Sequence, residues 1–190
     1  MSEMETEFLV VVDCQVDFIR GSLACLEAEE AVDRIVDYIN SKDDLQVMYS
    51  MDWHSPENGS FLENGGIWPP HCVQGTPGAE LDRRFYDCLG EGKYRPGSSN
   101  MFRKGTDDLV EEYSAAGAVN EDGVRLDQVP GDRVTVCGIA SEYCVRETVL
   151  AFLEMGKEVT LVTGGLGFVE KEGHSKNLED LSVRGVLLVP

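Results

Sequence analysis

The chain lacks the features that mark several common classes of protein. It has no apolar run close to the ~20 residues that span a bilayer. Basic residues are scarce, with 16 lysines and arginines against 35 aspartates and glutamates, so the net charge is −19 and the pI is near 4.4. Nucleic acids and anionic membrane surfaces would repel such a chain. We therefore expect neither a nucleic-acid nor a membrane partner, and the acidity indicates general solubility or a salt-adapted source.

Three further absences bear on compartment and cofactor. The start, Met-Ser-Glu-Met-Glu-Thr-Glu, lacks the basic residues that open a secretory signal, which predicts a cytoplasmic protein. The six cysteines form no CxxC pair, which argues against a zinc ribbon or a thioredoxin motif. No GxGxxG follows the first apolar run, so a Rossmann dinucleotide site is disfavoured.

What the chain does contain is an alternation of strand-like and helix-like segments. The length of 190 residues suits a single domain over residues 1–190. The alternation predicts an α/β fold, a three-layer doubly wound and mostly parallel sheet with helices on both faces. We expect strands at 8–12, 45–50, 134–137, 159–163 and 186–189, helices at 28–40, 107–116, 141–155 and 176–184, and a long functional loop at 53–78.

Cys144 is the strongest candidate for reactivity. It follows the strand at 134–137 and falls near the start of the predicted helix, where unpartnered backbone N–H groups favour the thiolate. Asp13 ends the strand at 8–12, and ligands in such sheets bind beyond the carboxyl ends of strands. Asp13 is therefore the best candidate to accept the thiol proton, and a lysine could balance the charge. The residues alone do not separate Lys104 from Lys93.

A second constellation has the donors of a metal site. In Asp52-Trp-His54 the two outer side chains project to the same side of an extended segment. His71 follows in Trp-Pro-Pro-His71, where two prolines restrict the backbone. One carboxylate and two imidazoles suit Zn²⁺, Fe²⁺ or Mn²⁺, while the alternative is a pair of hydrogen-bonded loop histidines.

Taken together, these segments resemble the isochorismatase-like hydrolase superfamily, and within it the nicotinamidase/pyrazinamidase branch. The matching stretches occur in the family's order and cover almost the whole chain. They are Val-Val-Asp13-Cys-Gln15-Val-Asp17-Phe18, Asp52-Trp-His54, Trp68-Pro-Pro-His71-Cys-Val-Gln-Gly-Thr, Arg-Lys104-Gly-Thr-Asp and Cys-Gly138-Ile-Ala140-Ser-Glu-Tyr-Cys144-Val.

The resemblance implies a catalytic triad of Asp13, Lys104 and Cys144. It selects Lys104 over Lys93 because Lys104 carries the family's Lys-Gly-Thr context. It also implies a non-proline cis peptide bond before Ala140, with the N–H groups of Ala140 and Cys144 forming an oxyanion hole.

The resemblance further implies the metal and the pocket walls. A divalent metal ion, zinc first and iron or manganese as alternatives, would bind Asp52, His54 and His71. Some family members add a fourth ligand, often histidine, in the interval where this chain has Asn58, Ser60 and Glu63. Water or one of these residues would complete the site. The aromatic walls around a pyridine ring would be Phe18 and Trp68.

The implied activity is hydrolysis of nicotinamide, or a similar small aromatic amide, to nicotinate and ammonia through a cysteine thioester, within pyridine nucleotide salvage. A related hydrolase of N-carbamoyl, ureido or other amide compounds is the nearest alternative. A non-catalytic ligand-binding or redox-sensing domain is the alternative of a different class, and isochorismatase activity is less favoured. Family members often assemble, so a homo-oligomer stays open.

Overall fold

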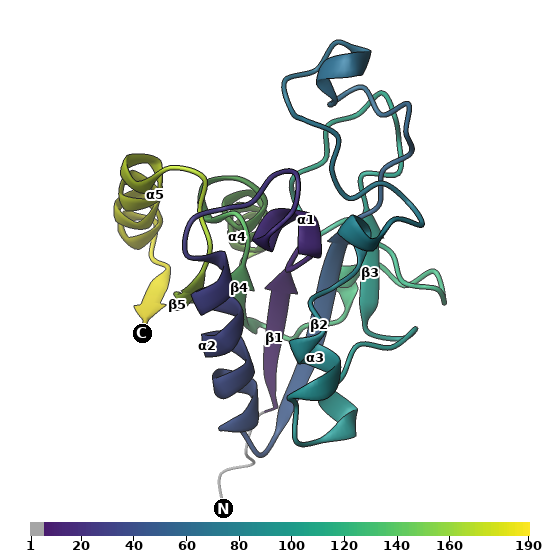
Figure 1. The fold of residues 1–190 in the computed structure, drawn as a ribbon. Helices are drawn as coiled ribbons and strands as arrows, with labels where there is room; N and C mark the ends of the chain where they lie inside the picture. Colours follow the sequence, from purple (N-terminus) through teal and green to yellow (C-terminus); the bar gives the residue numbers. More distant parts are fainter. Residues whose placement is uncertain (1–5) are drawn as a thin grey trace, which may run out of the picture.

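The computed structural model describes residues 6–190, which fold around one six-stranded sheet. Figure 1 shows β1 and β2 side by side at the centre of the molecule. All neighbouring strands run parallel, in the spatial order β3-β2-β1-β4-β5-β6. Residues 1–5, which hold most of the acidic start, lie outside the described part of the chain. The strands are β1 (Glu7–Val12), β2 (Leu45–Asp52), β3 (Met101–Lys104), β4 (Arg133–Gly138), β5 (Glu158–Leu166) and β6 (Leu187–Val189).

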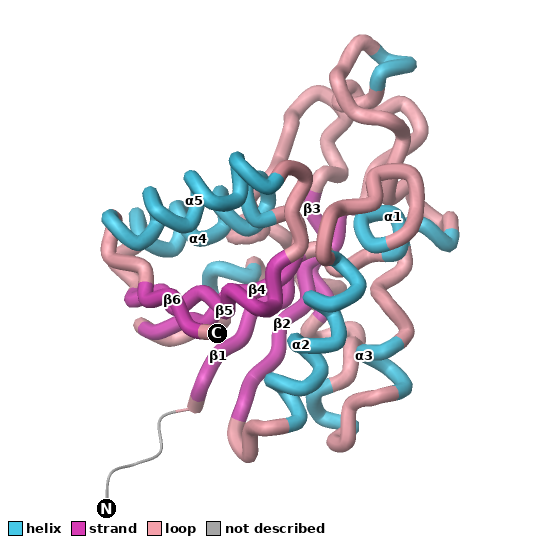
Figure 2. Tube along the Cα trace, turned by 60° about the vertical axis from the view of Figure 1, so that its left-hand side comes forward, coloured by secondary structure: helices cyan, strands magenta, loops and turns pink. Residues whose placement is uncertain are grey.

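Helices cover both faces of the sheet, which confirms the predicted fold class (Figure 2). The longer helices α2 and α5 lie on opposite faces, α2 with α3 and α5 with α4. Among the described residues, no helix is both long enough and apolar enough to cross a bilayer. The helices are α1 (Val16–Ile19), α2 (Ala28–Asn40), α3 (Arg84–Asp87), α4 (Arg146–Glu154) and α5 (Lys171–Val183).

Strand β1 shows why the sequence gives this layering. Its side chains alternate, so Leu9 and Val11 pack into the cluster under α2, while Val10 and Val12 pack under α4. All four are fully buried. Burying a side chain of this size stabilises the fold by roughly 1.5–3 kcal/mol, so a strand apolar on both sides must lie at the centre of a covered sheet.

The order of the strands places a crevice between the carboxyl ends of β1 and β4. From β1 the chain proceeds outward to β2 and β3, and from β4 it proceeds the other way to β5 and β6. Such a topological switch point is where α/β sheets bind ligands. Close packing there depends on Gly138, whose φ is +123° and whose added Cβ would lie 2.1 Å from the Val12 carbonyl oxygen.

The segment 107–116 and the strand β3 differ from the prediction in kind. The helix predicted at 107–116 is wrong, because this segment forms turns and extended backbone. The Asp107 carboxylate accepts the Leu109 N–H at 2.9 Å, and such a local bond competes with a helix. The edge strand β3 went unrecognised, since its four residues Met-Phe-Arg-Lys alternate in burial over too short a span to give a clear pattern.

The helix predicted at 141–155 begins differently from expectation. A π-helical turn, Ser141–Val145, precedes α4, and it carries Cys144. Helix α5 also starts earlier than predicted, at Lys171 instead of residue 176. The Glu142 carboxylate accepts the N–H groups of Val169 and Glu170 at 2.9 and 2.7 Å, which satisfies donors at this helix start from a distant part of the chain.

Candidate active site

Lys104 is the centre of a buried ionic cluster at the switch point. Its Nζ lies 2.9 Å from Asp13 Oδ2, 2.5 Å from Asp52 Oδ1 and 3.6 Å from Cys144 Sγ. It also donates to the Glu112 carbonyl at 3.1 Å. The side chains of Lys104 and Asp13 are fully buried. Three strands thus bring these groups together, since Asp13 follows β1, Asp52 ends β2 and Lys104 ends β3.

Lys93, the alternative lysine, takes no part in this cluster. Its Nζ pairs with Glu91 at 3.2 Å and donates to the Asp43 carbonyl on the exposed surface. The structure therefore places Lys104, the lysine that the family context selects, beside Asp13 and Cys144.

The Asp13 carboxylate has two oxygens in different situations. Oδ1 accepts the Ser50 hydroxyl at 2.6 Å, while the buried Oδ2 has Lys104 as an ionic neighbour but makes no well-aligned hydrogen bond. A carboxylate oxygen of Asp13 and the sulfur of Cys144 lie within 4.8 Å of each other. Burial raises the pKa of Asp13 above its ordinary value although Lys104 opposes the shift. A more basic carboxylate with free acceptor capacity suits the removal of a thiol proton.

The buried position of Cys144 opposes the thiolate that a helix start would favour. Burial raises the pKa of the Cys144 thiol well above its ordinary value; Lys104 lowers it, and Asp13 raises it further. Cys144 is only 6% exposed, so water does little to stabilise a charge on its sulfur. Burial thus favours the thiol over the thiolate, which suits a site in which a neighbouring base takes the thiol proton.

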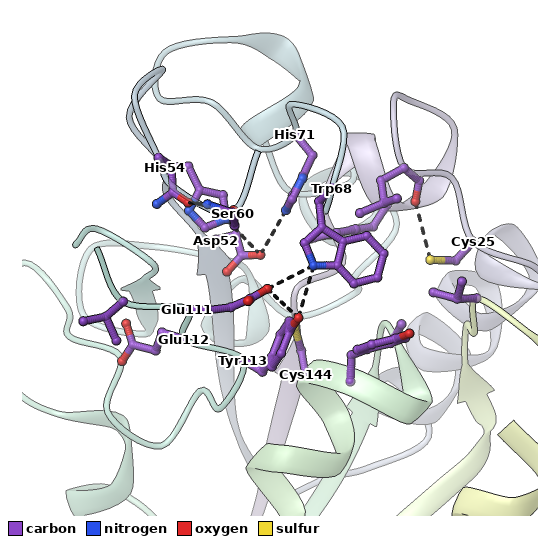
Figure 3. Close-up of a pocket in the computed structure, with 17 residues that line it drawn as sticks. Cys25, Asp52, His54, Ser60, Trp68, His71, Glu111, Glu112, Tyr113 and Cys144 are labelled. Atoms are coloured by element: carbon purple, nitrogen blue, oxygen red, sulfur yellow. Dashed lines mark hydrogen bonds and ion pairs between the residues drawn. The ribbon is translucent and has the colours of Figure 1, made fainter. Parts of the chain in front are cut away.

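Three predicted metal ligands converge beside this cluster (Figure 3). Asp52 Oδ2 lies 3.4 Å from His54 Nε2 and 3.9 Å from His71 Nε2. Each histidine uses Nδ1 for a backbone carbonyl, that of Gly105 at 2.8 Å and that of Pro69 at 2.7 Å. These contacts favour N–H at Nδ1 and leave each Nε2 lone pair directed at one point, which is the arrangement a metal ion requires. Asp52 thus contacts Lys104 through Oδ1, while its Oδ2 faces the two histidines of the candidate metal site.

The three candidates for a fourth metal ligand lie in different places relative to the cavity. Asn58 and Ser60 line the cavity next to the histidines, and Figure 3 shows Ser60 beside His54 and Asp52. Glu63 is exposed and does not line this cavity. Ser60 Oγ donates to Asn58 Oδ1 at 2.6 Å and keeps lone pairs that could accept or coordinate.

A cavity of about 530 Å³, including its open mouth, is lined by Cys144 and by the three candidate metal ligands Asp52, His54 and His71. Both predicted aromatic walls, Phe18 and Trp68, line it, as do Ala140 and Cys144. The peptide bond between Ile139 and Ala140 is cis, as the family resemblance implied.

The sequence interpretation missed several cavity residues. Glu111, Glu112 and Tyr113 lie in the segment wrongly assigned to a helix, and Tyr143 directly precedes Cys144. Glu111, Glu112 and Tyr113 could have been found only by recognising 105–116 as a second cavity-forming loop. The turn-forming Gly-Thr-Asp-Asp run that opens it is the available signal.

Comparison with known proteins agrees with this architecture. A family model described as the isochorismatase domain matches residues 7–189. The chain belongs to the isochorismatase family. It is 31% identical over 188 residues to the nicotinamidase of Escherichia coli strain K12, covering 85% of this chain and 83% of the relative.

Solved structures of the isochorismatase family show similar folds. The pyrazinamidase of Pyrococcus horikoshii, in complex with zinc, is 34% identical, with a TM-score of 0.80 over 97% of this chain and 99% of that chain. PnC1 of L. infantum, in complex with nicotinate, is 32% identical, with a TM-score of 0.81 over 97% of this chain and 92% of that chain.

Proposed function

We propose that the protein hydrolyses nicotinamide to nicotinate and ammonia, with Asp13, Lys104 and Cys144 as the catalytic residues. The observation that carries the proposal is a thiol, that of Cys144, which lines an aromatic cavity and lies beside a buried base with free acceptor capacity and a buried cation. The relatives named nicotinamidase and the neighbour in complex with nicotinate support this substrate.

The first half of the reaction forms a thioester. Asp13 Oδ2 takes the thiol proton of Cys144, and the sulfur attacks the carboxamide carbon. Asp13 then returns the proton to the amide nitrogen, the C–N bond breaks and ammonia leaves. In the second half, Asp13 takes a proton from water, and the resulting hydroxide attacks the thioester. The C–S bond breaks as Asp13 returns that proton to the leaving sulfur, and the nicotinic acid formed loses its own proton to the released ammonia, which leaves nicotinate and the regenerated thiol.

The negative charge that develops on the carbonyl oxygen needs donors. The proposed oxyanion hole consists of the backbone N–H groups of Ala140 and Cys144, both of which line the cavity. A donor of this kind lowers the barrier by roughly 3–4 kcal/mol. Lys104 holds Asp13 in place, and its positive charge 3.6 Å from the sulfur stabilises the thiolate as it forms.

The donor set beside the catalytic residues fits a divalent metal ion. Three buried side chains offer a carboxylate oxygen and two imidazole nitrogens within 4.8 Å of one another, and the second nitrogen of each ring is already engaged. We propose that Asp52, His54 and His71 hold this ion, with zinc favoured by the zinc complex of the neighbouring pyrazinamidase. When bound, the ion would act as a Lewis acid toward the pyridine nitrogen, directly or through water, and so orient the ring.

Phe18 and Trp68 would flank the pyridine ring, since flat aromatic faces pack well against a flat heterocycle. The substrate is then a small neutral molecule held by apolar walls and a few polar groups, as is usual for such pockets. A cytoplasmic location, a homo-oligomer and the single-domain extent of 1–190 stay predictions.

An amide panel with metal analysis on the same preparation tests the proposal. Nicotinamide, N-carbamoyl and ureido compounds and isochorismate are supplied in turn, and ammonia or the corresponding product is measured. The proposal predicts the highest kcat/KM for nicotinamide and about one bound divalent ion per chain. A clear preference for a carbamoyl or ureido compound would assign the protein to another reaction of the family.

A further inference from the structure

A carboxylate at the cavity mouth joins the two loops that form the aromatic wall. Glu111 Oε1 accepts the indole N–H of Trp68 at 3.0 Å and the phenol O–H of Tyr113 (Figure 3). The same indole N–H lies 3.1 Å from the Tyr113 oxygen, so the three groups close a triangle. Trp68 belongs to the loop at 53–78, whereas the other two residues belong to the segment 105–116.

The wall held by this triangle stands over the proposed nucleophile. The ring of Trp68 meets the ring of Tyr143 edge to face, with centroids 5.2 Å apart, and Tyr113 lies 5.7 Å from Tyr143. Tyr143 directly precedes Cys144, and all four side chains line the same cavity. A change in the position of the indole would therefore change the space available to a substrate.

The backbones on both sides of the triangle are fixed by other bonds. The Glu112 carboxylate accepts the Gly105 N–H at 2.9 Å, and the Trp68 N–H donates to the Ser60 carbonyl at 3.0 Å. What the Glu111 side chain controls is thus the orientation of the two rings, not the course of the chain. Glu111 itself is exposed, so its loss should not disturb the core.

The chemistry of the triangle favours the hydrogen-bonded arrangement of Glu111, Trp68 and Tyr113. Hydrogen bonds to a carboxylate are stronger than those between neutral groups. Burial and the Glu111 carboxylate raise the pKa of Tyr113 above its ordinary value, so the phenol keeps its proton and stays a donor. With the rings already ordered, the entropy cost of fixing them falls on folding instead of on substrate binding.

We propose that Glu111 is a positioning residue that latches Trp68 and Tyr113 over the substrate cavity and thereby sets the affinity for flat aromatic amides. The latch deepens the proposed function, since the amide used to measure it is nicotinamide. It acts on substrate binding, because Glu111 makes no contact with Asp13, Lys104 or Cys144 in the described structure.

Kinetics of three variants test the latch. Glu111→Ala should raise KM for nicotinamide about tenfold while kcat stays within about threefold of wild type, the split expected when binding alone is weakened. Glu111→Gln should raise KM less, because its amide oxygen can still accept both bonds. Glu57→Gln, which removes an exposed charge from the loop at 53–78, is the matched control and should leave KM unchanged.

Fluorescence gives a readout that does not depend on turnover. The chain has two tryptophans, so Trp53→Phe leaves Trp68 as the single reporter. In that background Glu111→Ala, and Tyr113→Phe as a second route to the same loss, should increase quenching of Trp68 by acrylamide. Unchanged KM and unchanged quenching would overturn the latch, as would a fall in kcat without a change in KM.

The two proposals fail in different ways. Increased quenching in Glu111→Ala, with no turnover of nicotinamide by the wild type, would support the latch and refute the proposed function. Turnover of nicotinamide with identical quenching and identical KM in both proteins would support the proposed function and refute the latch.

Discussion

At the scale of single residues, Lys104 links the two halves of the site. It contacts the proposed base Asp13 and the proposed metal ligand Asp52, each of which keeps its other oxygen for a different partner. Burial would lower the pKa of Lys104, but the two carboxylates raise it well above its ordinary value, so it stays charged. The proposed mechanism therefore assigns proton transfer to Asp13.

Replacing the proposed base tests this division of roles. Asp13→Asn keeps the shape of the side chain but cannot accept the thiol proton, so kcat/KM for nicotinamide should fall about 10²- to 10⁴-fold. Ammonia release measures the effect. Asp37→Asn, the same substitution at an exposed position of α2, should leave the rate unchanged. A rate for Asp13→Asn equal to that of wild type would remove Asp13 from the mechanism.

Many residues of the candidate site could be read from the sequence, and the exceptions share a cause. Asp13, Asp52 and Cys144 lie at or beyond the carboxyl ends of β1, β2 and β4, which the sequence pattern predicts as strands, so their shared rim was predictable. The contact between Asp52 and Lys104 was not predictable, because it depends on the pairing of β2 with β3, a strand that the sequence pattern did not reveal. In that pairing, Asp52 and Lys104 are register partners.

At the scale of elements, the close approach of β1 and β4 is the most demanding feature. Gly138 and Gly156 both have a positive φ. A Cβ added at Gly138 would overlap the Val12 carbonyl, whereas a Cβ added at Gly156, where φ is 79°, would have no atom within 4 Å. Substitutions at these two glycines therefore distinguish the cost of a strained backbone conformation from the cost of steric overlap.

This pair gives a matched test of packing at the switch point. Gly156→Ala should destabilise by about 1 kcal/mol, the cost of a left-handed conformation. Gly138→Ala should destabilise by more than about 3 kcal/mol or prevent folding, since the added methyl group meets backbone that cannot move without separating the strands. Urea unfolding of both variants measures the difference, and equal losses would show that the approach is looser than described.

A second element-scale prediction concerns the junction of α1 and α3. Asp82 accepts bonds from Arg84 and Arg20, and burial would raise its pKa but these arginines lower it to about 2. Because the folded pKa lies below the unfolded value near 3.8, the stabilisation is complete above about pH 4 and disappears as the pH falls through about 2.

Asp82→Asn should therefore destabilise the protein by about 1 kcal/mol near neutral pH, after allowance for the screening of half-exposed Arg20. The difference from wild type should shrink as the pH falls toward about 2. Unfolding curves over this range provide the measurement. A difference that stays constant with pH would mean that the lost contribution is packing and not charge.

The ends of an element could be predicted where burial imposes a regular pattern of apolar residues. They could not be predicted where a side chain from a distant part of the sequence caps a helix. Strand β1 and helix α2 match expectation to within one residue at each end. The start of α5 does not match, since the N–H groups of Val169 and Glu170, just before the helix, are satisfied by Glu142, far away in sequence. The helix predicted at 107–116 was wrong for the converse reason, because local Asp107 contacts replace helical bonds.

At the scale of the whole molecule, the acidic charge and the proposed metal position act together. A net charge of −19 draws divalent cations toward the protein, while the buried donors decide where one is held. Because those donors come from the end of β2 and the loop at 53–78, a bound ion would fasten this loop to the sheet.

Zinc should consequently stabilise the fold. After dialysis against a chelator, adding zinc at about 100 times its Kd should raise Tm by about 5–10 °C, as expected for a ligand that binds only the folded state. His71→Ala should abolish most of this shift. A shift of the same size in the variant would place the stabilising ion elsewhere on the acidic surface.

The central claim is that Cys144 attacks the amide carbon of nicotinamide. Ammonia release by wild type and by Cys144→Ala, compared at equal zinc content and with matching circular dichroism spectra, tests it most directly. The account predicts turnover by wild type and a loss of about 10³-fold or more in the variant. Equal rates for the two proteins would contradict it.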